Sequence, residues 1–413
     1  MSDLLPDAQS SPSDGGPLGT RRSLLASALG LAAGAGALAS CGEEPAIESA
    51  AADDPDALPF DLDASYFVNH GTAPLTLETK RALLDGLITP TERVFVRNNN
   101  GPPAGERLVD PSSWSVAFEG FGDGRSMTLA ELQGLGRETM ACVLQCSGNG
   151  RRFFSHGASG SQWGVGAAAN VVWTGVSLAR VSEALGGPAA GARFVTATGG
   201  DQLPPIDDVS SVVVERSVPL EHALSHAMLA WSMNGAPIPV THGGPLRLVV
   251  PGYYGINQVK YVERLALTAE ESTAKIQARG YRVRPIGESG DPSQPSMWEM
   301  NVKSWITSPL ETSAAGDTFV TGVAFSGAGA IDRVEVSVDG GATWGAAEFL
   351  GPDLGPFAWR TFALPWKATA GTHRLVCRAT DAAGETQPEE RLENERGYRH
   401  NGWRDHGVDV TVS

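Results

Sequence analysis

Cysteine is scarce in this chain, and its scarcity excludes several classes of protein. Four cysteines in 413 residues are too few for the disulfide framework of a small secreted domain. No Cys-x-x-Cys-His sequence occurs, so no haem of the c type is covalently attached. No glycine-rich dinucleotide fingerprint follows a predicted strand, which argues against a flavin or nicotinamide site. Any electrons that the chain handles must therefore leave to a separate molecule.

Basic residues are also few. Lysine and arginine number 31 against 47 aspartates and glutamates, which gives a formal net charge of −16. Nucleic acid is not expected as a partner, because binding to it needs a basic face. The same acidic balance favours a basic redox partner. The apolar content of 41% and the charged content of 19% are typical of a globular chain long enough for two domains.

The first apolar run is too short to span a membrane. It ends at Leu38, follows a twin-arginine pattern at Thr20–Leu25, and falls below the roughly 20 residues of a membrane helix. Residues 1–41 are therefore predicted to be an export signal. Cys41 ends a sequence that resembles a bacterial lipoprotein box, so we expect a lipid anchor there and a periplasmic or cell-envelope location. Ordinary signal cleavage nearby is the alternative. Residues 42–60 are acidic and rich in proline and alanine, and we expect a flexible linker.

The segment from Leu144 to Arg152 is the most informative motif. Cys146 ends an apolar run and is followed by Ser-Gly-Asn-Gly and by two adjacent arginines. A thiolate is a soft metal ligand that needs a metal or positive charge nearby, and guanidinium groups suit a small oxyanion. The segment predicts a metal ligand or nucleophile beside an anion pocket. The alternative is a buried, inert thiol, which is our interpretation of Cys142 and Cys377.

Cys146-Ser147-Gly148-Asn149 with the trailing arginines resembles the molybdenum-ligating loop of the sulfite oxidase family of molybdopterin enzymes. Further blocks resemble the family in the same order along the chain: Ile88–Asn98, Trp173–Val176, Met233–Tyr253 and Lys303–Pro309. Together the blocks fall within residues 60–405. Their order and spacing make the resemblance more specific than any single block.

The resemblance implies a fold of the α+β class, with a sulfite oxidase-like molybdopterin domain over residues 61–309. An all-β immunoglobulin-like sandwich is implied over residues 310–413, and in the family this domain forms a homodimer. The residues themselves agree, because no strict alternation of strands and helices precedes residue 309.

Local patterns predict several elements directly. Thr128 is an N-cap candidate for a short helix over Leu129–Leu135. The apolar run Thr139–Gln145 is consistent with a buried strand that ends at the metal loop. Valines alternate with polar residues over 334–338 and precede an Asp-Gly-Gly turn. This alternation predicts a half-buried strand that enters a hairpin.

The residues that bind substrate and cofactor are implied by the resemblance, position by position. Cys146 would supply the protein thiolate to molybdenum. The substrate side of the site is implied at Arg97, Arg151, Arg152, Trp163 and Tyr281. The molybdopterin is implied to contact Asn98, Asp201, His242, Arg247 and Lys260 as well as Cys146. A carboxylate at Asp201 suits the N–H donors of the pterin, whereas the cations suit its phosphate.

Several of these positions also have a structural interpretation. Arg97 and Arg152 would otherwise form salt bridges, Trp163 would pack in a core, and His242 would be a hydrogen-bonded structural histidine. One position departs from the family, because Asn99 stands where many members have histidine after Phe-Val-Arg-Asn. Asparagine keeps hydrogen bonding but carries no charge near neutral pH, so the departure bears on the pterin contact and on the substrate.

The implied function is oxidation of sulfite to sulfate, with electrons passed to a separate cytochrome c-type acceptor. The sulfane dehydrogenase type of the family is the alternative, and it acts on protein-bound sulfur through an open pocket. A function of another class also stays open, namely a surface lipoprotein with an inactive catalytic domain. Such decay would most simply remove Cys146, Arg97 or Arg151, yet all three are present. We therefore expect an enzyme.

Overall fold

The computed structural model describes residues 58–413. The predicted export signal, the lipid attachment at Cys41 and most of the predicted linker lie outside the described residues. From residue 58 onward, no helix is long and apolar enough to cross a bilayer.

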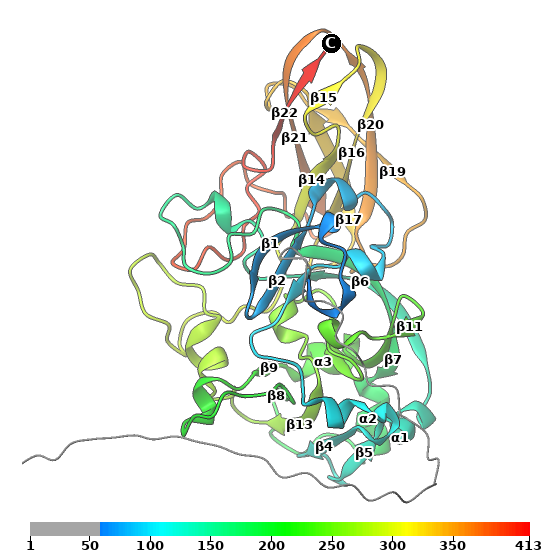
Figure 1. Ribbon diagram of the computed structural model, residues 1–413, viewed down its shortest axis with the longest axis vertical. Helices are drawn as coiled ribbons and strands as arrows, with labels where there is room; N and C mark the ends of the chain where they lie inside the picture. The colour runs from blue at the N-terminus through cyan, green and yellow to red at the C-terminus, as the bar shows by residue number, and fades with distance from the viewer. Residues whose placement is uncertain (1–57) are drawn as a thin grey trace, which may run out of the picture. The chain divides into compact units, whose positions relative to one another are not determined.

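Strands dominate the described part of the chain, and the helices in it are short (Figure 1). The α-helices are α1 (Leu129–Gly134), α2 (Leu178–Ala184) and α3 (Leu220–His226). Three single turns carry or precede site residues, namely η7 (Arg151–Phe153), η9 (Val240–His242) and the π turn η11 (Ile276–Gly280). The other turns are η1 (Pro59–Asp61), η2 (Ala64–Tyr66), η3 (Arg81–Leu83), η4 (Thr91–Arg93), η5 (Gly105–Leu108), η6 (Pro111–Ser113), η8 (Val209–Ser211) and η10 (Gly255–Asn257).

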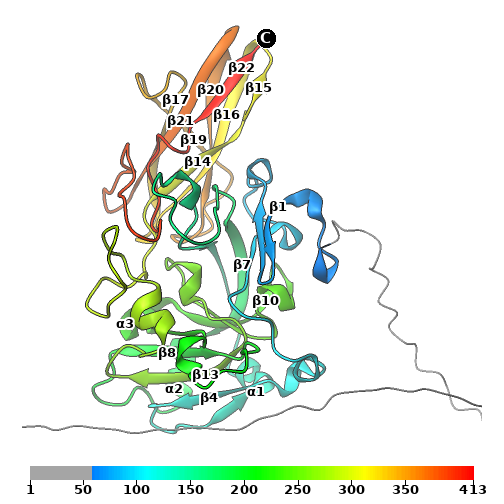
Figure 2. The same cartoon turned by 60° about the vertical axis from the view of Figure 1, so that its left-hand side comes forward.

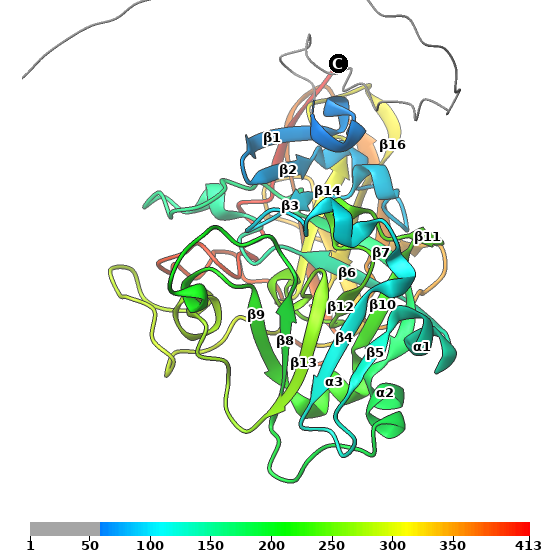
Figure 3. The ribbon, with the colours of Figure 1, turned by 60° about the horizontal axis from the view of Figure 1, so that its bottom comes forward.

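Three sheets form the N-terminal part. The first has the order β1-β2-β3, with strands β1 (Phe67–Thr72), β2 (Leu75–Thr79) and β3 (Val96–Arg97). The second sheet has the order β11-β10-β7-β6, and β12 also pairs with β10. Its strands are β6 (Glu138–Gln145), β7 (Ala168–Ser177), β10 (Met228–Met233), β11 (Ala236–Pro237) and β12 (Arg247–Val249). The third, visible in Figure 3, has the order β5-β4-β13-β8-β9, with strands β4 (Ser115–Glu119), β5 (Ser126–Thr128), β8 (Phe194–Gly199), β9 (Glu215–Pro219) and β13 (Val262–Thr268). The predicted α+β class is confirmed.

Local sequence explains two elements that lead to the site. Helix α1 begins at a capping box, in which Thr128 Oγ1 accepts from the Glu131 N–H (3.2 Å) and the Glu131 carboxylate accepts from the Thr128 N–H (2.7 Å). Strand β6 pairs with β7 along its whole length, and its C-terminal half is buried. The strand ends at Gln145, so Cys146 leaves the sheet at its end. The predicted helix and the predicted strand are both confirmed.

Two sheets form the C-terminal part (Figure 2). One has the order β14-β16-β20-β19, with strands β14 (Lys303–Ser308), β16 (Gly316–Phe325), β19 (Glu348–Leu350) and β20 (Arg360–Ala368). The other has the order β15-β22-β21-β17-β18, with strands β15 (Thr312–Ser313), β17 (Ile331–Ser337), β18 (Gly345–Ala346), β21 (Gly371–Asp381) and β22 (Val408–Val412). Apolar side chains of both sheets meet in one core, among them Phe362 of β20 and Val334 of β17. The predicted sandwich and its β17 hairpin are confirmed.

The sandwich begins before the boundary predicted at residue 310. Strand β14 pairs with β16 from Lys303 to Ser308, so it belongs to the C-terminal sheet. Pro309 follows directly, and proline interrupts a strand ladder because it lacks an N–H donor. The proline therefore marks a turn inside the domain, where the sequence pattern placed the start of the domain.

A cluster of large buried side chains joins the two parts. It contains Val143 of β6, Trp305 of β14, Phe325 of β16 and Tyr398 from the segment between β21 and β22. Full burial of a side chain of this kind contributes roughly 1.5–3 kcal/mol. The segment that carries Tyr398 is thereby packed against the N-terminal part of the chain.

Candidate active site

A cavity lies where the ends of β3, β6 and β8 meet the starts of β12 and β13. It is lined by these residues that the sequence singled out: Arg97, Asn98, Cys146, Asp201, His242, Arg247, Lys260 and Tyr281. Asn99, the position of the histidine-to-asparagine departure, also lines it. The lining residues come from separate segments of the chain, so the cavity exists only in the folded protein.

Cys146 is held by a short hydrogen-bonded loop directly after β6. The Cys146 N–H donates to the Ala167 carbonyl (2.9 Å), and the Asn149 N–H donates to the Cys146 carbonyl (3.0 Å). The Asn149 side chain donates to Gln145 Oε1 (3.1 Å) and accepts from the Ala167 N–H (3.1 Å). The Cys146 side chain is therefore fixed at the cavity wall, where it is partly exposed.

The two other cysteines of the described residues differ from Cys146. Cys142 and Cys377 are free and buried, and burial raises the pKa of their thiols to about 12 and about 11. A thiol with so high a pKa stays protonated and unreactive at neutral pH. The prediction of two buried thiols is confirmed.

Arg247, His242 and Lys260 form a cationic part of the lining. The buried Arg247 guanidinium donates to the His242 carbonyl (2.6 Å) and lies over the Trp173 ring (4.9 Å). Lys260 Nζ donates to Asn98 Oδ1 (2.6 Å). Burial, together with neighbouring cations, holds the pKa of Lys260 and of His242 well below the ordinary values. A bound anion would favour the charged form of both groups.

Among residues 58–413, Asp201 supplies the one carboxylate of the lining. Burial raises the pKa of its carboxyl to about 6, although nearby Lys260 opposes the rise. The lining as a whole is therefore richer in positive than in negative groups, which suits a ligand that carries phosphate.

Four buried polar atoms of the lining have no hydrogen-bond partner within residues 58–413. They are Ser147 Oγ, Asp201 Oδ2, Arg247 Nε and Gln258 Oε1. An unsatisfied buried polar group costs about 1–3 kcal/mol, and most such groups in native proteins are paired. The set includes both donors and acceptors. The cavity is therefore shaped for a polar ligand that offers partners of both kinds.

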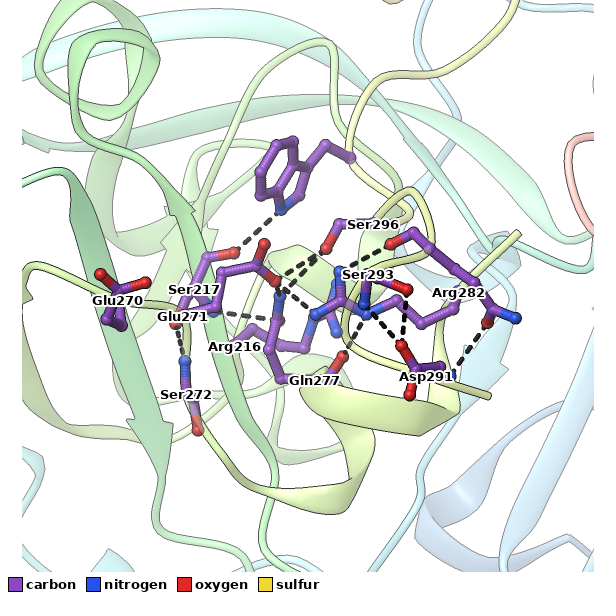
Figure 4. A network of polar contacts seen from close by, with 12 residues as sticks. Arg216, Ser217, Glu270, Glu271, Ser272, Gln277, Arg282, Asp291, Ser293 and Ser296 are labelled. Atoms are coloured by element: carbon purple, nitrogen blue, oxygen red, sulfur yellow. Dashed lines mark hydrogen bonds and ion pairs between the residues drawn. The ribbon is translucent and has the colours of Figure 1, made fainter. Parts of the chain in front are cut away.

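Tyr281 reaches the cavity from the π turn η11, which a buried polar network holds in place (Figure 4). Arg282 is almost fully buried and donates to the Gln277 carbonyl (2.9 Å) and to the Glu271 carboxylate (2.6 Å). The Gln277 side chain accepts from the Ser217 N–H of β9 (3.2 Å). The main chain on both sides of Tyr281 is therefore fixed. Single π turns are frequent at functional sites.

Known proteins match the chain over most of its length. Residues 103–276 match the oxidoreductase molybdopterin binding domain, and residues 294–412 match the Mo-co oxidoreductase dimerisation domain. Mitochondrial sulfite oxidase of Homo sapiens is 34% identical over 355 residues, which cover 80% of this chain and 63% of that protein. Sulfite oxidase of Gallus gallus is 34% identical over 354 residues, which cover 80% of this chain and 75% of that protein. The chain belongs to the sulfite oxidase family.

Among solved structures, the sulfane dehydrogenase SoxCD of Paracoccus pantotrophus is similar over 91% of this chain and 96% of that chain. The TM-score is 0.70 and the sequence identity is 26%. The chain therefore spans nearly all of that chain, whereas it spans 63% of the human sulfite oxidase.

Molybdopterin is the cofactor of the sulfite oxidase family, and the cavity fits it. The pterin ring offers N–H donors and oxygen acceptors, which match the unpartnered atoms Asp201 Oδ2 and Arg247 Nε. Its phosphate suits the cationic part of the lining around Lys260. Cys146 is the one cysteine of the lining, so it is the residue that would ligate molybdenum.

Arg151, a predicted substrate ligand of the family site, packs against the Cys146 loop and does not line the cavity. Its Nε donates to the Arg396 carbonyl (2.9 Å) and its Nη1 donates to the Ser161 carbonyl (2.8 Å). The guanidinium also lies against Gly148, where an added Cβ would overlap it. A glycine at residue 148 therefore lets Arg151 approach the metal loop closely.

Arg152 and Trp163, two further predicted substrate residues, also lie outside the lining. The Arg152 side chain is exposed, because η7 turns the two adjacent arginines to different sides. Trp163 is fully buried and packs edge-on against His70 (5.0 Å) and Phe95 (6.3 Å). The structure thus brings neither side chain to the cavity.

Three residues beside the family site were not predicted from the sequence, and all lie in or next to the C-terminal domain. Lys303 is buried, and its Nζ donates to the Asn149 carbonyl of the metal loop (2.8 Å). Burial lowers the pKa of Lys303 to about 7, although Cys146 opposes the fall. Arg396 and Tyr398 lie next to Arg151, and Arg396 Nε is buried without a partner in the described part of the chain. No local periodicity links these residues to a loop so far away in sequence.

Proposed function

We propose that the chain oxidises sulfite to sulfate at a molybdenum centre held by Cys146, and that the electrons pass to a separate cytochrome c-type acceptor. The observation that carries the proposal is the cavity, in which a partly exposed cysteine adjoins a cationic lining with unpartnered polar atoms. Similarity to sulfite oxidases supports the substrate, and the formal net charge of −16 supports a basic acceptor.

In this proposal the chain's own residues bind and orient the anion. Arg97 lines the cavity. Arg151 keeps one nitrogen, Nη2, without an acceptor in residues 58–413, while its other nitrogens donate to carbonyls. Neither arginine forms an ion pair with a described carboxylate, so both keep their charge. Arg97 can contact sulfite in the cavity, whereas Arg151, which packs against the Cys146 loop outside the lining, would attract the anion through its charge. The Tyr281 hydroxyl adds a hydrogen-bond donor at the same cavity.

Cys146 would contribute its thiolate to the molybdenum cofactor, and the bound cofactor would supply the redox capacity for the two electrons of the reaction. Conversion of sulfite to sulfate adds one oxygen atom from water and releases two protons with the two electrons. The loop hydrogen bonds from Cys146 and Asn149 keep the ligand sulfur in a fixed place during this cycle.

Sulfite-dependent reduction of ferricyanide by purified, molybdenum-loaded protein tests the proposal. We expect turnover that saturates with sulfite. Absence of turnover by fully loaded protein would overturn sulfite as the substrate. Failure of the protein to bind molybdenum in cells that make the cofactor would instead support the inactive-lipoprotein alternative.

Sulfane dehydrogenation is the second candidate function, and one feature favours it. A groove lined by Phe60, Pro74 and Pro204 shares Asn98 and Asn99 with the cavity. An open groove of this kind would let a carrier protein present bound sulfur to the cavity, and SoxCD is structurally similar over 91% of the chain. Parallel assays with sulfite and with a peptide-bound persulfide separate the candidates. Faster turnover of the persulfide would replace sulfite as the substrate.

The proposal extends to location and assembly. We expect export by the twin-arginine route and lipid attachment at Cys41, on the strength of the sequence pattern at residues 20–41. We expect a homodimer, because residues 294–412 match a dimerisation domain. Metabolic labelling with palmitate should mark the wild type but not Cys41→Ala. Light scattering of purified protein should give twice the mass of one chain, and a monomer mass would contradict the dimer.

A further inference from the structure

A column of stacked side chains contains two residues of the proposed site and two that the reaction does not use. The guanidinium carbon of Arg216 lies 5.6 Å from the centroid of the Tyr281 ring. The rings of Tyr281 and Tyr398 are stacked, with centroids 5.4 Å apart and an interplanar angle of 10°. The guanidinium carbon of Arg151 lies 5.5 Å from the centroid of the Tyr398 ring. Tyr398 therefore contacts both Tyr281 and Arg151.

Tyr398 is the link between two segments that are otherwise separate. Tyr281 follows η11, whereas Arg151 begins η7. From residue 58 to the C-terminus, no hydrogen bond joins Arg151 to Tyr281, and the ring contacts of Tyr281 are those with Arg216 and Tyr398. The Tyr398 ring therefore connects Arg151, which packs against the Cys146 loop, to Tyr281, which lines the cavity.

The column holds its arginines without neutralising them. Arg216 is buried, and its donors go to Asn257 Oδ1 (3.0 and 3.3 Å) and to the Ile276 carbonyl (3.0 Å). Arg151 donates to main-chain carbonyls. Neither forms an ion pair within the described residues. A carboxylate would cancel the charge of a guanidinium, whereas the face of an aromatic ring attracts the cation and leaves its charge intact. Arg151 thus keeps its charge for an oxyanion.

The main chain around Tyr398 is fixed from two sides. The Tyr398 N–H donates to Asn394 Oδ1 (2.9 Å), and Asn394 Nδ2 donates to the Tyr398 carbonyl (2.8 Å). Gly397 has a φ of +58°, and a Cβ there would come 2.9 Å from Arg151 Cγ. A residue with a side chain at 397 would therefore push Arg151 away. The main chain that carries the Tyr398 ring is therefore held by its own segment.

We propose that Tyr398 is a positioning residue that sets Arg151 and Tyr281 relative to each other for binding of a sulfur oxyanion. The inference rests on the proposed function for its substrate, and the ring of Tyr398 is the part that acts. The hydroxyl contributes little, because its nearest partner is the Gly280 carbonyl at 3.5 Å. Removal of the hydroxyl and removal of the ring should therefore have different effects.

Two variants of the molybdenum-loaded protein separate the ring from the hydroxyl. Tyr398→Leu removes the stacked ring, so we expect KM for sulfite to rise roughly tenfold, which is the size of one cation–π contact or one aromatic pair. Tyr398→Phe keeps the ring and should restore KM to within about twofold of the wild type. KM does not depend on the amount of active enzyme, and kcat is taken per bound molybdenum, so loss of folded or loaded protein does not affect either value. An unchanged KM in Tyr398→Leu would overturn the inference.

A double-mutant cycle shows whether Tyr398 acts through Arg151. Contacting residues give non-additive effects, so Tyr398→Leu should raise KM much less in an Arg151→Gln background than in the wild type. Equal effects in the two backgrounds would overturn the positioning role. A merely structural role would lower the melting temperature of Tyr398→Leu and leave KM of the loaded enzyme unchanged.

Binding of inorganic sulfate, measured by calorimetry on the loaded protein, gives a readout that does not need turnover. We expect Tyr398→Leu to weaken sulfate binding by roughly the factor by which it raises KM, and Tyr398→Phe to preserve it. Wild-type protein that binds sulfate but does not oxidise sulfite would sink the proposed function while the sulfate series still supports the positioning role. Oxidation of sulfite with sulfate binding unaffected in Tyr398→Leu would overturn the positioning role alone.

Discussion

The C-terminal sandwich buries apolar side chains between two sheets, whereas the active-site cavity buries polar and charged ones between strand ends. Phe362 and Val334 of the sandwich are almost fully buried and pack among apolar side chains. Arg247 and His242 of the cavity are as deeply buried, but burial holds the pKa of both below the ordinary values. The first arrangement lowers the free energy of the folded state, and the second raises it until a ligand is bound.

This difference in what is buried explains why the cavity needs the neighbouring domain. A site rich in buried cations and unpartnered polar atoms costs stability, and the neighbouring domain supplies both packing and direct support. Trp305 of β14 packs in the cluster that joins the two parts, and Lys303 of the same strand donates to the metal loop. The sandwich is therefore part of the active site's framework as well as a candidate dimer surface.

The largest expected effect comes from removing the metal ligand while leaving the fold intact. Cys146→Ser should abolish sulfite oxidation, because serine is a harder and far less acidic ligand than a thiolate. Steady-state assay of loaded protein measures the loss. The melting temperature should stay close to that of the wild type, since the loop hydrogen bonds around Cys146 use main-chain groups. Normal turnover in this variant would contradict the ligand assignment.

The second largest effect is a loss of stability from a substitution in the core of the sandwich, away from the cavity. Phe362→Ala empties a fully buried position and should lower the free energy of unfolding by about 3–5 kcal/mol. Phe319→Ala is the matched control, because Phe319 is 57% exposed on the neighbouring strand of the same sheet, and it should change stability by about 0.5 kcal/mol or less. Chemical denaturation measures both. Equal losses would show that the sandwich core is not where the structure places it.

A smaller effect is expected on KM for sulfite, and it should differ between the adjacent residues Arg151 and Arg152. Arg151→Gln removes a buried guanidinium beside the metal loop, one nitrogen of which has no acceptor within residues 58–413, so KM for sulfite should rise roughly 10- to 100-fold. Arg152→Gln is the matched control, since the Arg152 side chain is exposed, and its KM should change by less than about twofold. An equal rise for both variants would remove the distinction that the structure draws between them.

The smallest effect is a pH dependence of the cofactor-free protein. Burial raises the pKa of Asp201 to about 6, above its ordinary value in an unfolded chain. The folded state binds the proton more tightly than the unfolded chain does, so the cost of burying Asp201 is absent below a pH of 3.8, grows as pH rises to about 6, and levels off above that value. Asp201→Asn should therefore be more stable than the wild type above pH 6, by on the order of 2 kcal/mol. The difference should vanish near pH 4 in denaturant titrations; a difference that is constant with pH would contradict the burial of this carboxyl.

Elements with a regular repeat were predictable from the sequence. The capped helix α1, strand β6 and the alternating strand β17 follow from local patterns, because side-chain burial in helices and strands has a fixed period. The family resemblance then supplied the set of residues around Cys146, and most of them do line one cavity.

Irregular contacts were not predictable in the same way. Pro309 has the pattern of a domain boundary, yet the sheet starts at Lys303, because pairing between strands depends on a partner far away in sequence. The sequence alone does not distinguish the burial of Arg151 from that of Arg152. The turn η7 places Arg151 in the interior and Arg152 on the surface. No sequence pattern pointed to Tyr398, because its proposed role depends on contacts of its ring with Tyr281 and Arg151, which are far away in the sequence.

Cys146 is proposed to supply the one protein ligand to a molybdenum centre in this cavity. X-ray absorption at the molybdenum edge of the loaded wild type and of loaded Cys146→Ser tests it most directly, because the method counts sulfur neighbours of the metal. We expect one sulfur ligand fewer in the variant, with the metal still bound. The same number of sulfur neighbours in both proteins would contradict it.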